Sequence, residues 1–471
     1  MGVKMQLLNE FLKRNRERKL KIHCAGDALI DEYFDISIKR ISPEAPVMVM
    51  SSPNNSAVRR PGGAANVVYQ FKHFNVDPLL ICWCDELGKS VFVDHQIQWV
   101  HSLASQCCSL PIKRRFLDGG VQVVRHDIEL PLCGLSEHVI DFATLQIRNC
   151  IEKTFKPDVA ILSDYNKGFF SSEEHRVIDF YRDIKTIVDP KIGPLSKWKG
   201  CTIFKPNANE AMNLTGRTQW KEQAKHLQNE LECEAVVITS GGNDVSGIWY
   251  DDFFTFKPDR SVKVESVVGA GDCFVAFFAM AIGHGFSVPE AAEIAWSAGA
   301  NYVKNKRNRP IIPAELSLDG IVSPSDLVSR DFKLVFTNGC FDFGLTAAHV
   351  ECFKFAKEQG DKLVVAINSD DSVRRLKGEG RPILSFSERA KIVSALECVD
   401  YVIGFDNDTP LEVIKKIMPS VIVKGGDYTI DEVVGKDFAE VKIFPYIKAT
   451  STTDKIKRLS ESEEAKSSPC T

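Results

Sequence analysis

The sequence predicts an α/β protein built from two units, each of which handles a nucleotide phosphate. Short apolar runs alternate with longer helical patterns along most of the 471 residues, which are too many for one ordinary domain. Two glycine-containing signatures, Gly269-Ala270-Gly271-Asp272 and Thr337-Asn338-Gly339-Cys340-Phe341-Asp342, each precede a helical pattern. Backbone amides at a helix start can bind phosphate, because they are unpaired donors at the positive end of the helix dipole. The order of the two signatures therefore suggests a fusion of two enzymes.

The composition is that of a globular protein with a large core and no global charge signal. Hydrophobic residues make up 44% of the chain, and the net charge is −4, so we expect neither a nucleic-acid nor a membrane partner. The fourteen cysteines are scattered without zinc-site spacing, and we expect them to be thiols in a reducing compartment. No apolar run approaches membrane-spanning length, and the N-terminal segment lacks a signal-peptide core. These features predict a cytoplasmic protein.

Changes in pattern predict the domain organisation. Residues 1–20 are expected to form an amphipathic segment, and residues 21–320 a first α/β domain. Residues 321–332 are the expected linker, and residues 333–459 a second α/β domain. Residues 460–471 are rich in Ser, Glu and Lys and are expected to be disordered.

Strand-like runs in the first domain follow the main alternation with two exceptions. Several of them end in Asp, Asn, Ser or Gly, as expected where parallel strands deliver ligand-binding loops. The runs are residues 21–25, 79–83, 159–162, 186–188, 202–205 and 235–239. Residues 46–51 and 121–125 also look like strands but interrupt the alternation, so we expect a small accessory sheet over the active site.

The signature Gly269-Ala270-Gly271-Asp272 is weak by itself, because small residues at helix starts are common packing devices. Asp272 could accept the proton of a hydroxyl that attacks a γ-phosphate. Three other segments support this interpretation at strand ends and helix starts: Gly62-Gly63-Ala64-Ala65-Asn66, Asn207-Ala208-Asn209-Glu210 and Thr239-Ser240-Gly241-Gly242.

On these motifs, residues 20–320 resemble the ribokinase (PfkB) family of sugar kinases. The resemblance implies a ribokinase-like fold that uses ATP and Mg²⁺. It also implies a catalytic base with adjoining anion-binding residues, a sugar-contacting segment, an ATP site and one metal-binding residue. The base is Asp272, with Gly269, Ala270 and Gly271 as the anion-binding residues, and the sugar-contacting segment contains Gly62, Gly63 and Asn66. The ATP site contains Asn207, Glu210, Thr239, Gly241 and Gly242, and the metal-binding residue is Glu210.

Further segments resemble the heptose-7-phosphate kinases of ADP-heptose synthesis, namely residues 26–33, 40–47, 60–67, 163–168 and 188–191. A sugar phosphate would need cations, and its hydroxyls could bind carboxylates. The sugar-binding candidates are Lys113, Arg125, Lys167, Asp27, Asp31 and Asp127. A solvated surface charge is the alternative for each cation, and a capping or turn role is the alternative for each aspartate.

One departure from the family lies just before the base. The family has an acidic residue and a threonine there, where this chain reads Ser266-Val267-Val268. The loss of a carboxylate could weaken metal handling. The base and the anion-binding residues remain, so we expect an active kinase.

Residues 333–459 resemble the cytidylyltransferase-like nucleotidyltransferases, which have a Rossmann-like fold, and specifically the adenylyltransferase half of the same bifunctional heptose enzymes. The matching segments are residues 337–342, 366–370, 376–378, 381–382, 387–389, 423–428 and 451–453. The resemblance implies a nucleotide-binding set composed of Asn338, Gly339, Phe341, Asp342, Thr346, His349, Lys377, Lys424, Asp427, Ser451 and Thr452.

The second signature is imperfect where the family carries His-x-Gly-His. Thr346 stands at the first histidine, Ala348 replaces the glycine, and His349 remains. A charge-assisted hydrogen bond contributes roughly 1.5–3 kcal/mol, so its loss could cost one to two orders of magnitude in rate. We therefore expect a weakened or inactive transferase rather than a fully active one.

Four functions remain open at this point. The first is phosphorylation of a heptose 7-phosphate at C1, followed by adenylyl transfer to the heptose 1-phosphate. The second is a sugar kinase whose C-terminal domain is degenerate or structural. The third is a non-catalytic nucleotide sensor or scaffold, and the fourth is a kinase for another sugar. By analogy with related sugar kinases, we expect a homodimer that pairs through the accessory sheet of the kinase domain.

Overall fold

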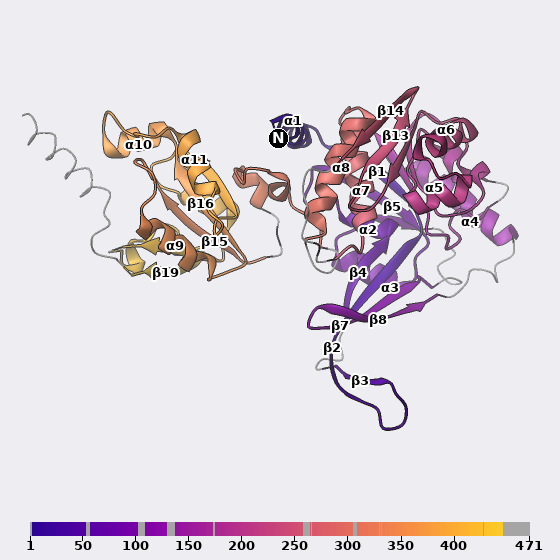
Figure 1. The fold of residues 1–471 in the computed structure, drawn as a ribbon, viewed down its shortest axis with the longest axis horizontal. Coiled ribbons are helices and arrows are strands. Elements are labelled where there is room, and N and C mark those ends of the chain that lie inside the picture. Colours follow the sequence, from indigo (N-terminus) through magenta and orange to yellow (C-terminus); the bar gives the residue numbers. More distant parts are fainter. Residues whose placement is uncertain are drawn as a thin grey trace, which may run out of the picture. The chain divides into compact units, whose positions relative to one another are not determined.

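The structure is a computed structural model with two compact units, Met1–Ile311 and Ile312–Thr471 (Figure 1). It describes residues 2–52, 57–101, 109–129, 137–172, 175–257, 264, 266–304, 309–328, 330, 332–426 and 428–445. The division falls before the expected boundary at residue 320 and before the expected linker 321–332. Ile312, Ala314 and Leu327 pack in a core of the second unit, and Ile321 forms a parallel bridge with Val402. Their apolar side chains assign this loop-rich passage to the second unit.

A nine-stranded sheet forms the centre of the first unit. Its order is β14-β13-β12-β11-β10-β9-β1-β5-β6, and the pairs from β12 through to β6 are parallel. The strands are β1 (Leu20–Gly26), β5 (Val76–Cys82), β6 (Trp99–His101), β9 (Val159–Ser163), β10 (Lys185–Asp189), β11 (Ile203–Phe204), β12 (Ala235–Thr239), β13 (Val245–Trp249) and β14 (Asp252–Phe256). The six predicted strands correspond to β1, β5, β9, β10, β11 and β12. They read as apolar runs because both faces of the sheet are covered.

Helices cover this sheet, and α7 contributes a long buried stretch to the core. The helices are α1 (Gly2–Glu17), α2 (Ala64–Tyr69), α3 (Glu86–Asp94), α4 (Glu137–Lys153), α5 (Ala208–Thr215), α6 (Trp220–Leu231), α7 (Ala270–Gly283) and α8 (Val288–Tyr302). Residues 272–282 of α7 are all buried, which explains why this helix is apolar around its whole circumference.

The N-terminal segment is part of the first unit rather than a separate element. Leu8, Phe11 and Leu12 of α1 are buried. The ring of Phe11 lies 6.2 Å from that of Phe277 and 6.3 Å from that of Phe286. The amphipathic pattern is therefore the pattern of a helix that packs on the kinase-like core.

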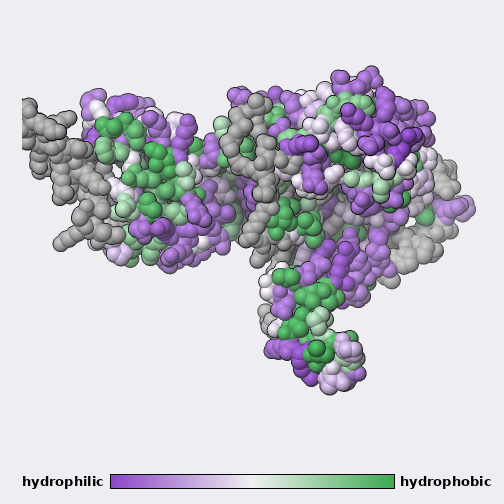
Figure 2. Space-filling view, in the orientation of Figure 1, coloured by the Kyte–Doolittle hydropathy of each residue, from purple (hydrophilic) through white to green (hydrophobic). Residues whose placement is uncertain are grey.

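The expected accessory sheet is present. It contains β3 (Met48–Ser51), β2 (Ala28–Ile41), β7 (Ile112–Asp118) and β8 (Val121–Ile128) in that order, and β4 (Val58–Gly63) also pairs with β2. Its β2–β3 hairpin projects from the rest of the unit (Figure 1) and carries exposed apolar side chains (Figure 2). They include Ile41, Val47, Met48 and Met50, which are 39–69% exposed.

The second unit has a five-stranded parallel sheet in the order β17-β16-β15-β18-β19. The strands are β15 (Leu334–Gly339), β16 (Lys362–Asn368), β17 (Tyr401–Phe405), β18 (Val421–Gly425) and β19 (Glu440–Phe444), and the helices are α9 (Ala347–Lys357), α10 (Asp370–Lys377), α11 (Phe386–Ser394) and α12 (Leu411–Ile417). The strand order reverses between β15 and β18. In open α/β sheets, ligands bind outside the carboxyl ends of the strands at such a point.

Among the described helices of both units, none is long and apolar enough to cross a membrane.

Candidate active sites

Asp272, the predicted base, lies in the first turn of α7 and is 5% exposed. Its carboxylate accepts a hydrogen bond from Asn66 Nδ2 at 2.7 Å and another from the Tyr165 hydroxyl. Burial raises the pKa of Asp272 to about 6, while the hydrogen bonds from Tyr165 and Asn66 oppose that rise. A carboxylate with such a pKa is ionised near neutral pH and basic enough to accept a proton.

The first turn of α7 leaves space for an anion. Gly269 is the N-terminal cap of α7 and has a φ of 77°, a conformation that favours glycine. A side chain at Gly271 would meet no atom within 4 Å. Amides of the first helical turn point out of the helix, so a phosphate could approach them here.

The segment Gly62-Gly63-Ala64-Ala65-Asn66 brings Asn66 against the base. Gly63 has a φ of 58°, and a Cβ there would lie 2.4 Å from the Asp27 carbonyl oxygen. Only glycine therefore fits where β4 turns into α2. Asn66 is fully buried, and its Oδ1 accepts from Gln70 Nε2 at 3.0 Å while its amide donates to Asp272. These contacts make Asn66 a residue that positions the Asp272 carboxylate.

Asp27 has the turn role that was the alternative to sugar binding. Its carboxylate accepts backbone N–H bonds from Tyr165 at 2.9 Å, Lys167 at 3.0 Å and Phe169 at 3.0 Å. Burial raises the pKa of Asp27 to about 6, and the three N–H bonds oppose that rise. The carboxylate thereby holds the loop after β9, which carries Tyr165 to Asp272. These contacts fit the turn role, and direct sugar binding by Asp27 stays a prediction.

Asp31 and Lys113 lie on the accessory sheet beside the base. Asp31 pairs with Arg115, and both side chains are less than 8% exposed. Lys113 Nζ lies 5.0 Å from the centre of the Tyr165 ring, and burial lowers the pKa of this lysine. Within the described part of the chain, no hydrogen bond or ion pair engages Lys113 Nζ, so this ammonium can receive an anionic substrate.

The other predicted cations of the sugar site already have acidic partners at the surface. Arg125 Nε and Nη2 contact Asp127 at 2.7 and 2.5 Å, an arrangement in which β8 pairs two of its own residues. Lys167 Nζ lies 2.7 Å from Glu129. Each pair is partly exposed, so its net contribution to stability is small and a phosphate could compete for the cation.

Asn207 and Glu210 form the capping box of α5. Asn207 Oδ1 accepts from the Glu210 amide at 2.9 Å, and Glu210 Oε2 accepts from the Asn207 amide at 2.8 Å. Glu210 Oε1 also accepts from Lys191 Nζ at 2.6 Å. Asn207 bridges to Thr239 at the end of β12, and a Cβ added at Gly241 or Gly242 would meet no atom within 4 Å. The predicted ATP residues therefore gather at one edge of the sheet.

The oxygen donors at this edge suit a hard cation only if phosphates supply the remaining ligands. Lys205 Nζ contacts Asp189 at 3.0 Å, and Lys191 contacts Glu210, so both carboxylates already have ammonium partners. Among the described residues, no group of three or more potential ligands gathers for a metal. Mg²⁺ commonly binds through one or two carboxylates together with substrate phosphates.

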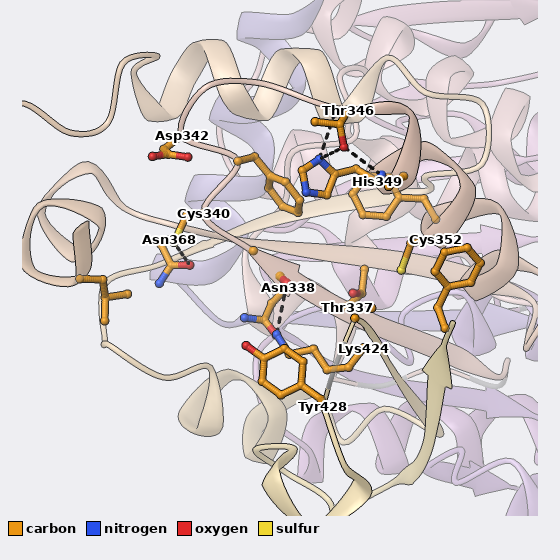
Figure 3. Close-up of a pocket in the computed structure, with 18 of the residues that line it drawn as sticks. Thr337, Asn338, Cys340, Asp342, Thr346, His349, Cys352, Asn368, Lys424 and Tyr428 are labelled. Atoms are coloured by element: carbon orange, nitrogen blue, oxygen red, sulfur yellow. Dashed lines mark hydrogen bonds between the residues drawn. The ribbon is translucent and has the colours of Figure 1, made fainter. Parts of the chain in front are cut away.

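The second unit has a cavity of about 500 Å³ at the carboxyl ends of β15 and β18, where the strand order reverses (Figure 3). Its lining includes the described members of the predicted nucleotide set: Asn338, Gly339, Phe341, Asp342, Thr346, His349, Lys377 and Lys424. Asp427, Ser451 and Thr452 lie outside the described residues.

Two walls of this cavity carry polar groups suited to phosphate. On one wall, Thr346 is the N-terminal cap of α9 and contacts Nδ1 of His349. On the other, Lys424 Nζ donates to Asn338 Oδ1 at 2.9 Å and lies 5.3 Å from the centre of the Tyr428 ring (Figure 3). Burial lowers the pKa of Lys424. The partners of this ammonium are neutral, so its charge is available to an anion.

The loop of residues 339–344 shapes the cavity mouth. Phe341 has a φ of 48°, and its ring packs where a Cβ on Gly339 would lie 2.6 Å away, so Gly339 has a steric reason to be glycine. Asp342 accepts from Arg381 Nη1 at 2.5 Å, and its carbonyl accepts the amides of Ile383 and Leu384. Asp342 therefore fastens two loops together.

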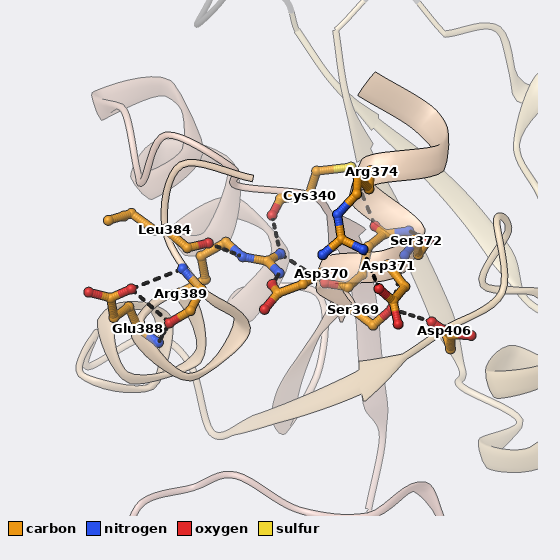
Figure 4. Close-up of polar contacts among 12 residues, drawn as sticks. Cys340, Ser369, Asp370, Asp371, Ser372, Arg374, Leu384, Glu388, Arg389 and Asp406 are labelled. Carbon is orange, nitrogen blue, oxygen red and sulfur yellow. Dashed lines mark hydrogen bonds and ion pairs between the residues drawn. The ribbon is translucent and has the colours of Figure 1, made fainter. Parts of the chain in front are cut away.

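Arg389 is the most connected residue near this loop, and the sequence prediction did not place it in the site. Its side chain is 0% exposed and donates to the carbonyls of Cys340, Asn368 and Leu384 at 2.6–3.0 Å (Figure 4). It also contacts Asp370 at 2.6 Å. A fixed fork of donors suits this task, which is to hold the ends of β15 and β16 in register. Its place in the matched segment 387–389 was the available signal.

Tyr165 is the corresponding omission in the first unit. Its hydroxyl donates to Asp272, and Lys113 and Lys191 lie 5.0 and 5.4 Å from its ring centre. It stood in the matched segment 163–168, but no local pattern distinguishes it there from its neighbours.

Comparison with known families gives the same two units in the same order. Residues 177–314 match the pfkB family of carbohydrate kinases, and residues 336–467 match the cytidylyltransferase-like family. Among solved structures, phosphofructokinase-2 from Escherichia coli in complex with potassium covers 63% of this chain and 96% of its own, at 16% identity and a TM-score of 0.49.

Full-length relatives extend this result over the whole chain. The bifunctional protein HldE of Hydrogenovibrio crunogenus is 33% identical over 94% of this chain and 97% of its own length. HldE of Aliarcobacter butzleri is 34% identical over 95% and 99%, and HldE of Wolinella succinogenes 34% over 93% and 97%. The chain therefore belongs to the HldE family of bifunctional proteins, with a sugar-kinase unit followed by a nucleotidyltransferase unit.

Proposed function

We propose that the first unit phosphorylates the C1 hydroxyl of a heptose 7-phosphate. The observation that carries this proposal is the buried Asp272 carboxylate, held by Asn66 and Tyr165 at the start of α7. Asp272 accepts the hydroxyl proton while the hydroxyl oxygen bonds to the γ-phosphorus of ATP, and ADP leaves. The choice of heptose 7-phosphate as the substrate is supported by the matched segments of the accessory sheet and of the loop after β9.

ATP is the donor for this step, and Mg²⁺ would accompany its phosphates. Glu210 and Asp189 are the carboxylates that could contact the ion directly or through water. The ion would supply neutralisation of the phosphate charge. Lys191 and Lys205, which contact these carboxylates, stand where they can bind the same phosphates.

The second unit is proposed to transfer AMP from ATP to the heptose 1-phosphate. The sugar phosphate oxygen bonds to the α-phosphorus, and pyrophosphate leaves. No protein group forms a covalent bond, so positioning and charge neutralisation supply the rate. Lys424, Lys377 and His349 surround the cavity in which this charge develops.

A two-step assay on the full-length protein tests both reactions. Heptose 7-phosphate with ATP should release ADP, and heptose 1-phosphate with ATP should release pyrophosphate. ADP release without AMP incorporation would support the kinase-only alternative. Faster ADP release with fructose phosphates or ribose than with heptose 7-phosphate would overturn the proposed substrate.

The assembly is proposed to be a homodimer that pairs through the accessory sheet. The exposed apolar side chains of the β2–β3 hairpin support this, since large exposed apolar patches commonly mark interfaces. A Met48→Lys, Met50→Lys double variant should elute as a monomer in light-scattering chromatography, whereas a monomeric wild type would refute the proposal. A cytoplasmic location fits the free thiols of the described cysteines.

A further inference from the structure

Thr346 and His349 make a reciprocal contact at the start of α9. The Thr346 amide lies 3.0 Å from His349 Nδ1, and the Thr346 hydroxyl oxygen lies 3.1 Å from the same nitrogen. In return, the hydroxyl oxygen accepts the His349 amide at 3.4 Å. The residue that replaces the first histidine of the signature is therefore bonded to the histidine that remains.

The direction of these bonds determines where the ring proton lies. A backbone N–H can only donate, so Nδ1 of His349 must accept from the Thr346 amide. A neutral imidazole has one donor and one acceptor nitrogen, so the proton of the neutral ring is on Nε2. The Thr346 hydroxyl can accept the His349 amide and donate to Nδ1 at the same time, so it strengthens this arrangement.

The ring is also held from the side. Phe341 packs edge-to-face on it, with ring centres 5.2 Å apart, and Phe341 itself packs against Phe353 at 5.6 Å. His349 lines the cavity, and its second nitrogen lies on the side of the ring away from Thr346 (Figure 3). The Nε2–H bond is therefore a donor directed away from α9 at the cavity wall.

We propose that Thr346 is a positioning residue that holds His349 in the tautomer whose Nε2–H donates to a phosphate oxygen in the cavity. This inference rests on the adenylyl transfer proposed for the second unit. It assigns Thr346 a different role from that of a replaced phosphate ligand. The hydroxyl acts on the imidazole, and the imidazole acts on the phosphate.

Solid-state ¹⁵N NMR of the full-length protein, labelled at histidine, measures the tautomer without any activity. The His349 signals are identified by their loss in His349→Gln. The expected wild-type spectrum has a protonated Nε2 and a bare Nδ1, and Thr346→Ser should keep it. Thr346→Val keeps the backbone amide that donates to Nδ1 but removes the hydroxyl donor, so the Nδ1 signal should move toward that of an unbonded ring nitrogen and the other tautomer should appear as a minor form. A wild-type proton on Nδ1, or an unchanged spectrum in Thr346→Val, overturns the proposal.

Adenylyl transfer gives the second measurement. Thr346→Val should lower kcat by about tenfold, the effect of losing roughly one hydrogen bond in the transition state, and Thr346→Ser should restore most of it. If Thr346 only caps the helix, Thr346→Val should lower the melting temperature without changing the tautomer of His349. If Thr346→His exceeds the wild-type rate, the threonine is a lost phosphate ligand and the proposal fails. If the wild type transfers no AMP, the proposed function fails, and the ring assignment is still decided by the spectrum.

Discussion

The two centres place their charges in opposite ways. In the first unit the central group is a carboxylate, buried and held by the neutral donors Asn66 and Tyr165. In the second unit the central groups are cations with neutral partners or none described, since Lys424 contacts Asn338 and no described hydrogen bond or ion pair engages Lys377. The first arrangement suits the removal of a proton from a hydroxyl. The second suits neutralisation of phosphate charge, which needs no base at all.

The largest effect should come from removal of the base. Asp272→Asn keeps the shape and the hydrogen bond to Tyr165 but cannot accept a proton, so ADP release should fall by about 10²–10⁴-fold. Pyrophosphate release by the second unit should not change. Kinase turnover equal to that of the wild type would remove Asp272 from the mechanism.

Arg389→Met should disrupt the second centre by removing the side chain that holds its loops and strand ends together. The change leaves one buried and two partly buried carbonyls and Asp370 without their donor, and we expect the second unit to lose roughly 3–5 kcal/mol of stability. Denaturant unfolding should show this loss, and ADP release should persist. Arg374→Met is the matched control, because its pair with Asp371 is exposed and should contribute less than about 1 kcal/mol. Equal losses in both variants would contradict the role of Arg389.

Lys424→Met should separate binding from stability. Removal of the ammonium should lower adenylyl transfer by roughly 10–100-fold, because a charge-assisted contact with the phosphates is lost. The melting temperature should not fall, since burial already disfavours this charge. Lys442→Met on the neighbouring β19 serves as the control and should leave transfer unchanged. A loss of stability without a loss of rate would assign Lys424 a structural role.

The smallest effect concerns pH. Asp272 must be ionised to act as a base, so kinase kcat/KM should decrease tenfold per pH unit as the pH falls below its pKa of about 6. Tyr165→Phe removes a donor that stabilises the ionised form, so the decrease should begin about one pH unit higher. The pH dependence of pyrophosphate release by the second unit should not change in Tyr165→Phe. An identical acid limb in Tyr165→Phe would mean that the hydroxyl does not hold the carboxylate in solution.

The sequence predicted the architecture well because periodicity and strand-end residues report directly on covered parallel sheets. Side chains with two possible roles were harder. Asn207 and Glu210 have the spacing of a capping box, and their contacts in the structure are those of a capping box. The same two residues are also the predicted ATP residues, so the sequence pattern alone does not separate the two roles. Asp27 binds three amides of a loop more than 130 residues away in the chain. Such partners depend on which strands become neighbours, and a single sequence does not show this.

The boundary between the units was predicted too late for a related reason. Residues rich in Pro, Ser and Asn predict a linker, yet Ile312 and Leu327 belong to a core whose other members come from strands further along the chain. Tyr165 and Arg389 were missed because their contacts are with residues far away in the sequence: Tyr165 donates to Asp272, and Arg389 donates to the carbonyls of Cys340 and Asn368. Thr346 was interpreted by what it replaces, and the structure adds what it contacts.

The packing of α1 has a consequence for biosynthesis. Arg14 of this helix donates to the His284 carbonyl, 270 residues further along the chain, and Phe11 packs against Phe277 and Phe286. At about 5–20 residues per second, the ribosome completes these partners roughly fifteen seconds to a minute after α1 has emerged. During that interval the apolar face of α1 has none of these partners available. The apolar face of α1 can therefore be covered by these partners only after Phe286 has left the exit tunnel.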